Sequence, residues 1–356
     1  MATIYQNISR IDDDTICFHI YYGDQSHIKT VHKLDLYYRK EMFFYKDLNF
    51  YIPTNKNLNI FDFSKYHIIH MATPSFVGLF GKRIAKLYHK PLVGFYHTDM
   101  VKYFSMYTPN YCVPSRVGKY LGYLLVRFFY SSCDIIICQS QQIKNHLMYD
   151  LKFRNVDLWS TGVSHRIFFP SSDKEKRILR KEWKLPEDSF ICLYVGRISI
   201  EKNLEILGNV SESGNKVLVV LVGRGPYLNT LRRKIPFIYL GEHKHDKLGE
   251  IYRLADCFVF PSKTDTFGNV ILEALSSGLP IICDEKYVNS EIIMREKIGL
   301  LYDNLGSLIY SIVRLKNDSL LYKKLRGNAI CYSSNFSWER SVNELKNIYS
   351  QILDKN

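Results

Sequence analysis

The sequence lacks several features that would assign it quickly to a class. Its eight cysteines include no Cys-x-x-Cys pair, and no cluster of His and Cys has the spacing of a zinc site. Several cysteines, such as Cys138 and Cys257, lie inside apolar runs. We therefore expect small core residues in a reducing compartment, with neither disulfides nor a bound metal.

Long apolar runs and a leader-like start are also missing. Residues Met1 to Asp14 are polar and acidic, unlike a signal peptide. The longest apolar stretch, Tyr120 to Tyr130, is interrupted by Arg127 and is too short to cross a bilayer. The expected location is cytoplasmic, either soluble or peripheral at the cytoplasmic face of the membrane.

Acidic residues are fewer than basic ones. The chain has 48 Lys and Arg against 35 Asp and Glu, which gives a net charge of +13. This charge divides almost evenly, at about +7 over residues 1–165 and about +6 over residues 166–356. Such a field favours anionic partners, but no dense Lys/Arg run marks a nucleic-acid stripe. A nucleotide or an acidic lipid surface fits this charge, and no nucleic acid is expected as partner.

The chain does have the length and composition of a folded globular protein. Its 356 residues, of which 46% are hydrophobic, are enough for two domains. Short β-branched runs alternate with amphipathic segments, which is typical of an α/β protein with parallel sheets. The most polar mid-chain segment, 170–184, is predicted to be a linker.

The alternation predicts particular elements. In the first half, strands are expected at 16–22, 66–71, 91–97 and 134–139, with helices at 77–89 and 115–131. In the second half, strands are expected at 190–195, 216–222, 237–240, 257–260 and 280–283, with helices near 202–210, 226–234, 246–254 and 268–277. Residues 337–353 carry apolar side chains at helical spacing and predict a closing helix.

The strongest chemical signal lies between Cys257 and Cys283. A strand turns through Pro261 and enters a helix near Gly268, whose free N–H groups and dipole suit a phosphate. Asp265 and Glu273 could accept hydrogen bonds from sugar and ribose hydroxyls beside that phosphate. Each alone also fits a structural interpretation, as a helix N-cap or a solvated helix residue. The joint pattern favours a nucleotide-sugar site.

This segment resembles the nucleotide-sugar signature of the family 4 retaining glycosyltransferases, in which an acidic residue precedes a Glu with seven residues between them. Asp265 stands where Glu is usual, as in the sulfolipid-synthase-like and mannosyltransferase-like branches. The resemblance implies that Asp265 contacts the transferred sugar and Glu273 the ribose. It also implies that the diphosphate is bound by backbone amides around Phe267, Gly268, Asn269 and Val270.

A second element follows the strand at 190–195. Gly196-Arg197, with Lys202 five positions after the Arg, places two cations at the carboxyl end of a parallel strand. Alone this pattern is often plain surface charge near a turn. It also resembles the Gly-Arg…Glu-Lys element of the same family, which implies that Arg197 and Lys202 neutralise the leaving nucleotide diphosphate in place of a metal.

Two further turns are weaker signals. Gly223-Arg-Gly225-Pro leaves a strand for a helix, a turn equally common without a nucleotide. The resemblance places these glycines next to the donor nucleotide, and the Gly241-Glu242-His243 turn near its base.

In the first half, His97-Thr-Asp99 ends a buried strand. A histidine at such a position is usually structural. The string resembles the Tyr-His-Thr-Asp segment of the lipid-directed branch, so we expect His97 and Asp99 in the catalytic cleft.

The resemblance covers residues 64 to 353 and departs from the family in two places. The Gly-Gly loop after the first strand has no counterpart, and Asp284 to Ser290 replaces a small-residue turn. Asp12-Asp13-Asp14 looks like an Asp-x-Asp metal motif, but we interpret it as a solvated turn. The segments 77–89 and 115–131 combine basic and apolar residues; they predict either ordinary packed helices or an anionic membrane surface as partner.

The expected fold is α/β of the GT-B type, with two Rossmann-like, doubly wound parallel-sheet domains facing across a cleft. The expected domains are 1–165, completed by a helix at 337–356, and 166–336. The expected function is metal-independent, cofactor-free, retaining transfer of a hexose-type sugar from a UDP- or GDP-linked donor to a lipid, glycan or other hydroxyl acceptor. A degenerate nucleotide-sugar-binding protein and a GT-B sugar-nucleotide epimerase remain alternatives.

Overall fold

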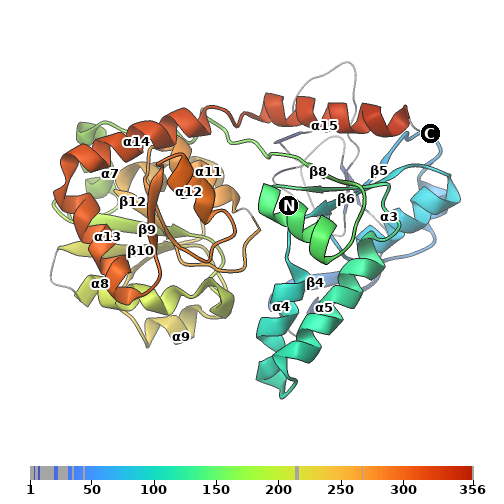
Figure 1. Cartoon of the computed structure of the whole chain (residues 1–356), viewed down its shortest axis with the longest axis horizontal. Helices are drawn as coiled ribbons and strands as arrows, with labels where there is room; N and C mark the ends of the chain where they lie inside the picture. The colour runs from blue at the N-terminus through green and yellow to red at the C-terminus, as the bar shows by residue number, and fades with distance from the viewer. Residues whose placement is uncertain are drawn as a thin grey trace. The chain divides into compact units, whose positions relative to one another are not determined.

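The computed structural model describes residues 45–212, 216–266 and 268–354, together with short pieces nearer the start (4, 7–8, 20–22, 31–33 and 36–42). The chain divides into two compact units. Unit 1 comprises residues 1–162 and 338–356, and unit 2 comprises residues 163–337. Figure 1 shows each unit as a sheet with helices packed on it.

Unit 2 contains a six-stranded, wholly parallel sheet in the order β11-β10-β9-β12-β13-β14. Its strands are β9 (Phe190–Val195), β10 (Val217–Val222), β11 (Ile238–Gly241), β12 (Cys257–Phe260), β13 (Ile281–Asp284) and β14 (Gly299–Tyr302). The five strands expected here are confirmed, and β14 was not foreseen.

Two apolar layers cover this sheet because side chains alternate along each strand. On β9, Ile191 and Leu193 belong to one buried cluster, and Cys192 and Tyr194 to the other. Four helices bury side chains in the first cluster: α7 (Asp173–Glu182), α10 (His245–Leu254), α11 (Asn269–Ser276) and α12 (Ser290–Arg295). The second is covered by α8 (Gly208–Glu212), α9 (Leu228–Arg232) and α13 (Leu305–Asn317). α14 (Ser319–Ser333) contributes to both. The predicted doubly wound architecture is confirmed.

The strand order reverses between β9 and β12. The chain proceeds from β9 outward through β10 and β11, and from β12 outward through β13 and β14 on the other side. Ligands of open α/β sheets bind outside the carboxyl ends of the strands at such a switch point. The loops that follow β9 and β12 are therefore the first place to look for a site.

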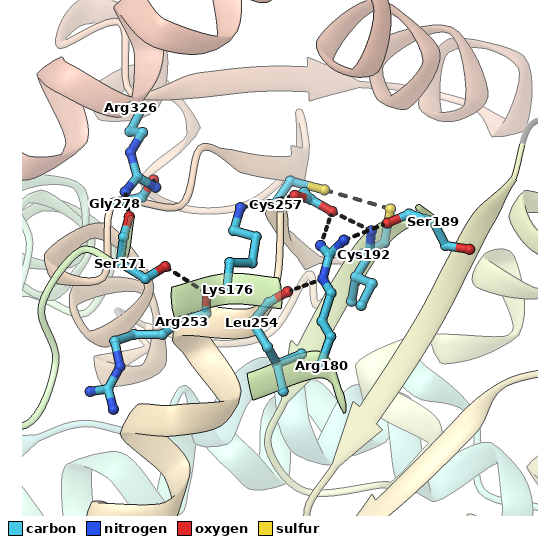
Figure 2. A network of polar contacts seen from close by, with 12 residues as sticks. Ser171, Lys176, Arg180, Ser189, Cys192, Arg253, Leu254, Cys257, Gly278 and Arg326 are labelled. Atoms are coloured by element: carbon cyan, nitrogen blue, oxygen red, sulfur yellow. Dashed lines mark hydrogen bonds and ion pairs between the residues drawn. The ribbon is translucent and has the colours of Figure 1, made fainter. Parts of the chain in front are cut away.

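The expected linker at 170–184 is wrong, because this segment forms helix α7 inside unit 2. Arg180 is buried and donates to the carbonyl oxygen of Leu254 at 2.9 Å (Figure 2). It also donates to the carboxylate of Asp256 at 2.6 Å. Lys176 contacts the other carboxylate oxygen of Asp256 at 2.9 Å. A segment rich in charged residues can still be buried in a fold when each buried charge has a partner.

Unit 1 is built on a four-stranded parallel sheet in the order β5-β6-β7-β8. Its strands are β5 (Ile69–Met71), β6 (Leu92–Tyr96), β7 (Ile135–Cys138) and β8 (Val156–Leu158). Helix α3 (Phe76–Leu87) follows β5, and α4 (Met100–Tyr107) and α5 (Ser115–Tyr130) form a pair after β6. Near the start, β1 (Ile20–Tyr22) pairs in parallel with β2 (Val31–Lys33), and β3 (Leu36–Met42) pairs antiparallel with β4 (Tyr45–Pro53). Residues 16–19 of the predicted first strand lie outside the described residues.

The last helix, α15 (Trp338–Leu353), returns to unit 1. Its apolar side chains, including Leu345 and Ile348, join the buried cluster formed by β6 and β7. Trp159 donates from its indole nitrogen to the carbonyl oxygen of Ser341 at 3.0 Å. The predicted closing helix is therefore confirmed, and it completes the core of unit 1.

Candidate functional site

The loops after β9 and β12 meet through an ion pair between Lys202 and Asp265. The ammonium nitrogen of Lys202 lies 2.6 Å from one carboxylate oxygen of Asp265 and 2.7 Å from the other. Both side chains remain partly exposed, at 14% and 25%. The two residues belong to separate sequence motifs, and the structure brings them together.

Lys202 is held by a short 3-10 turn (Ile200–Lys202). The Ser199 hydroxyl donates to the Glu201 carboxylate at 2.6 Å, and both side chains are buried. Asn203 then reverses the chain with φ at +54°, a left-handed conformation that Asn tolerates better than most residues. A buried polar contact thus fixes the backbone from which Lys202 extends.

Arg197 lies two residues after β9, with its side chain half-buried. The buried hydroxyl of Tyr194 donates to the carbonyl oxygen of Arg197 at 2.9 Å. Burial raises the pKa of Tyr194 well above its usual value, with a further contribution from the charge of Asp265. The phenol therefore stays protonated and holds the Arg197 backbone in place.

Gly223 and Gly225 let the loop after β10 approach the loop after β9. A Cβ on Gly223 would lie 2.0 Å from the carbonyl oxygen of Gly196, and one on Gly225 would lie 2.1 Å from that of Ile198. The Ile198 amide donates to the carbonyl oxygen of Arg224 at 2.9 Å. These glycines pack backbone against backbone and so support the Arg197 loop. Their expected position beside the nucleotide remains a prediction.

The turn after β11 joins the same edge of the sheet. The Gly223 amide donates to the carbonyl oxygen of Gly241 at 2.7 Å. Glu242 forms an exposed pair with Arg224 at 3.4 Å. His243 donates from Nε2 to the carbonyl oxygen of Leu240 at 2.6 Å. Proximity of this turn to a nucleotide base remains a prediction.

Helix α11 begins beside Asp265. Gly268 is its N-cap residue with φ at +78°, a conformation that favours glycine. The first N–H groups of a helix have no intrahelical acceptor and suit an anion. Asn269 and Val270, expected to bind the diphosphate, form the first turn. Phe267, expected in the same role, lies outside the described residues.

Glu273 lies one turn further along α11, and its carboxylate accepts a hydrogen bond from the hydroxyl of Tyr252 at 2.9 Å. Tyr252 comes from α10 and is buried, with no motif to single it out in the sequence. Burial raises the pKa of Glu273 to about 7, although the Tyr252 hydrogen bond lowers it. The proton occupancy of Glu273 therefore changes near neutral pH.

The segment 284–290, which departs from the family pattern, supports the loop after β12. Asn289 is buried, and its amide nitrogen donates to the Tyr287 hydroxyl (3.1 Å) and to the carbonyl oxygen of Thr266 (3.4 Å). Lys263 pairs with the buried carboxylate of Asp284 at 3.2 Å. The unusual residues thus fix the loop that carries Asp265.

The expected residues of unit 1 lie after β6. His97 is half-buried, and its Nδ1 is 2.9 Å from the Thr98 hydroxyl. Burial lowers the pKa of His97 to about 3, so its imidazole is neutral at physiological pH. Asp99 is buried and caps α4 by accepting from the amide of Lys102 at 3.1 Å. The cap explains Asp99 structurally, and a catalytic role for either residue remains a prediction.

Among the residues that the structure describes, no group of three His, Cys, Asp or Glu side chains could hold a metal ion. The Asp12-Asp13-Asp14 segment lies outside them. Within the same described ranges, no helix combines the length and apolar character needed to cross a membrane.

Two family models match the chain, one to each half. The model described as Glycosyltransferase Family 4 matches residues 19–166, and the model described as Glycosyl transferases group 1 matches residues 175–331. The first match ends, and the second begins, close to the boundary between the two units at residue 162 or 163.

Curated relatives include proteins named for lipids and for GDP-mannose. The chain is 28% identical to the sulfoquinovosyl transferase SQD2 of Arabidopsis thaliana, over 80% of this chain and 56% of that protein. It is 28% identical to the alpha-monoglucosyldiacylglycerol synthase of Streptococcus pneumoniae (80% and 68%) and to a GDP-mannose-dependent alpha-mannosyltransferase of Mycobacterium tuberculosis (70% and 64%). The chain thus spans 56% to 68% of the length of these three relatives.

Solved structures show the same fold. The sucrose-phosphate synthase of Thermosynechococcus elongatus superposes with a TM-score of 0.69 at 22% identity, over 82% of this chain and 75% of that one. HepE of Anabaena in complex with UDP-glucose superposes with a TM-score of 0.68 at 18% identity, over 81% and 79%.

Proposed function

This chain belongs to the family 4 glycosyltransferases of the GT-B fold, and from that premise we propose that it transfers a hexose-type sugar from a UDP- or GDP-linked donor to an acceptor hydroxyl. The acceptor class we propose is a lipid or a glycan. We propose further that the anomeric configuration is retained and that no metal takes part.

The observation that carries the proposal is the Lys202–Asp265 pair at the carboxyl ends of β9 and β12. A nucleotide diphosphate needs cations, and a sugar needs acceptors for its hydroxyls; this pair supplies both at one point. The N-terminus of α11 adds donors for phosphate oxygens. Glu273, further along the same helix, supplies an acceptor for the ribose hydroxyls.

In the proposed reaction, the bond from the anomeric carbon to the leaving phosphate oxygen breaks, and a bond to the acceptor oxygen forms on the same face. The acceptor hydroxyl gives its proton to the leaving phosphate. The products are a glycoside and a nucleoside diphosphate. Arg197 and Lys202 stabilise the negative charge that develops on the leaving group, a role that a metal ion fills in other transferases.

The remaining roles follow from position. Asp265 exchanges part of its contact with Lys202 for hydroxyls of the transferred sugar. Gly196, Gly223 and Gly225 shape the loops around the diphosphate, and the Gly241 turn lies toward the base. His97, neutral and at the end of β6, contacts the acceptor or the transferred sugar, while Asp99 fixes the loop that carries it.

The relatives support the proposed substrate classes. The first relative is named as a sulfoquinovosyl transferase, and the second as a synthase of monoglucosyldiacylglycerol, a lipid that carries a sugar. The name of the mannosyltransferase specifies GDP-mannose, and HepE was solved with UDP-glucose. Both bases are therefore included in the proposal.

A donor screen tests the function directly. UDP- and GDP-sugars are first compared for binding by thermal shift, and each binder is then incubated with diacylglycerol and with glycan acceptors, with and without EDTA. Transfer with retained configuration, measured by NMR and insensitive to EDTA, supports the proposal. Sugar isomerisation without an acceptor indicates an epimerase instead. Tight binding without transfer or hydrolysis indicates a nucleotide-sugar-binding protein.

A further inference from the structure

Helices α4 and α5 form a hairpin in unit 1 and lie side by side in Figure 1. Two glycines on the inner face of α5 allow close packing. A Cβ on Gly118 would lie 2.5 Å from the carbonyl oxygen of Phe104, and one on Gly122 would lie 2.7 Å from that of Met100. The same face buries Val126 and Phe129. The inner face of α5 therefore packs against the rest of unit 1.

The outer face of α5 has a second apolar stripe, which is largely exposed to solvent. Its side chains repeat at helical spacing and are exposed by 41% to 62%: Val117, Tyr120, Leu121, Leu124 and Phe128. Single exposed apolar residues are common, but a contiguous row of five large ones marks an interaction surface.

Positive charge lies along one side of this stripe. Arg116 and Arg127 are exposed there, Lys119 is exposed on another face of α5, and the helix contains no acidic residue. From residue 63 to residue 133 the chain has nine Lys and Arg and a single carboxylate, Asp99. Because Asp99 is buried at the cap of α4, it adds no negative charge to the surface. The complement of this surface is therefore both apolar and anionic.

We propose that the outer face of α5 docks into the interface of an anionic lipid bilayer, with its helix axis in the membrane plane. The apolar stripe enters the boundary between headgroups and acyl chains, and the flanking basic residues bind lipid phosphates. The 16 residues of α5 give a contact about 24 Å long. A membrane fits better than a protein partner because it offers apolar chains and anionic groups along the whole length of α5, and it needs no specific pocket.

The structure distinguishes α5 from α3, the other basic helix selected from the sequence. In α3, Phe80 and Ile84 are buried against Phe63, and the exposed large apolar side chains are confined to its two ends, at Phe76 and Leu87. Lys82 of α3 extends to α5, where its ammonium group donates to the carbonyl oxygen of Phe128 at 2.7 Å. α3 thus contributes charge at the edge of the docking face, and α5 contributes the apolar contact.

Flotation with lipid vesicles tests the proposal. The full chain is mixed with phosphatidylcholine vesicles, or with vesicles containing one third phosphatidylglycerol, at low and high salt. We expect flotation with the anionic vesicles, weakened by salt, and about fivefold weaker partitioning for each flanking basic residue replaced by Gln, as in Arg116→Gln. The double variant Leu121→Glu/Leu124→Glu should no longer float. A control pair in unit 2, Tyr310→Glu/Leu320→Glu, removes apolar residues that are even more exposed and should float like the wild type.

A second measurement covers the case in which the Glu variant misfolds. In Tyr120→Trp, brominated lipids should quench the fluorescence of the introduced indole, whereas the wild-type tryptophans should be quenched far less. The proposal is overturned if the wild type does not float with anionic vesicles, if the α5 and unit 2 double variants float equally, or if the indole introduced at position 120 is not quenched. A concentration-dependent dimer abolished by Leu121→Glu/Leu124→Glu would also overturn it, because the stripe would then be a contact between two copies. None of these readouts depends on sugar transfer.

Discussion

Lys202 and Asp265 are 63 residues apart in the sequence, and the ammonium group of one lies within 2.7 Å of both carboxylate oxygens of the other. The pair joins the loops that follow two neighbouring parallel strands, at the point where the sheet reverses its order. Asp265 therefore orients the ammonium group of Lys202, and Lys202 compensates the negative charge of Asp265.

The first prediction concerns this pair. Lys202→Met should lower kcat/KM on a working donor by about 10²- to 10³-fold, because one fixed cation facing the leaving phosphate is lost. Lys247→Met removes an exposed lysine that pairs only with its helix neighbour Glu250, and it should retain full activity. Steady-state kinetics of both variants provide the comparison. Equal rates for Lys202→Met and the wild type would rule out the assigned role.

Nucleotide affinity should depend on pH through Glu273. Its carboxylate must be ionised to accept from ribose hydroxyls, and burial raises its pKa to about 7 in the free protein. Affinity should therefore increase as pH rises from 6 to 8 and then level off. In Tyr252→Phe, the pKa of Glu273 should rise because a hydrogen bond that lowers it is removed, so the midpoint moves to higher pH. Calorimetric titration with the preferred nucleoside diphosphate measures this. Tyr310→Phe, at an exposed position, is the matched control, and a midpoint shared by all three proteins would contradict the assignment.

The same residue should reduce stability. A carboxyl group whose pKa is higher in the folded protein than in the unfolded chain stabilises the fold when protonated, and this contribution is lost as pH rises from about 4.5 to about 7. Glu273→Gln removes the group that would have to ionise. Its melting temperature should exceed that of the wild type at pH 8, with a smaller difference at pH 5. Nucleotide binding should weaken in the same variant. Thermal unfolding that gives the same difference at both pH values would refute the buried ionisation.

Gly223→Ala should destabilise unit 2 by about 1–3 kcal/mol, because the residue has φ at +125° and a Cβ would collide with the carbonyl oxygen of Gly196. Gly327→Ala is the control. Gly327 lies within α14, and an added Cβ there would have no atom within 4 Å. Alanine favours helices, so this variant should gain about 0.5–1 kcal/mol. Urea denaturation of both proteins gives the two free energies; destabilisation of similar size in each would contradict the packing argument.

Asp256→Asn should destabilise the protein by about 3–5 kcal/mol, since it leaves the largely buried cations of Lys176 and Arg180 without their counter-ion. An exposed pair nearby, Lys181 with Glu187, is the comparison. Glu187→Gln should cost less than about 1 kcal/mol. Chemical denaturation measures the free energy of unfolding of both variants. Similar decreases in the two would mean that burial of the Asp256 ion pairs adds little to stability.

Much of the fold of unit 2 was predictable because its strands are continuous apolar runs buried on both faces. β9 and β12 begin and end at the residues expected. The hairpin of β3 and β4 was not foreseen, and neither was β14. Helix α7 was misassigned because its charged side chains are buried only through contacts with Asp256, which lies far along the sequence.

The site was predictable in part for a similar reason. Asp265, Glu273, Arg197 and Lys202 follow strands and match a known pattern. The contact between Lys202 and Asp265 depends on β9 and β12 being neighbours, a property of strand order that local sequence does not contain. Tyr252 and Asn289 left no signal because each acts through hydrogen bonds to residues on other segments.

Helix α15 has a consequence for the order in which the protein folds during translation. In the sequence, unit 2 is inserted between the two segments that form unit 1, and Val163 and Phe336 near its ends are joined by a backbone hydrogen bond of 2.9 Å. A ribosome therefore releases every residue of unit 2 before it releases α15. Until α15 is made, the N-terminal segment of unit 1 leaves the apolar surface around Trp159 exposed. A chain truncated before residue 338 would therefore contain a complete unit 2 and an incomplete core in unit 1.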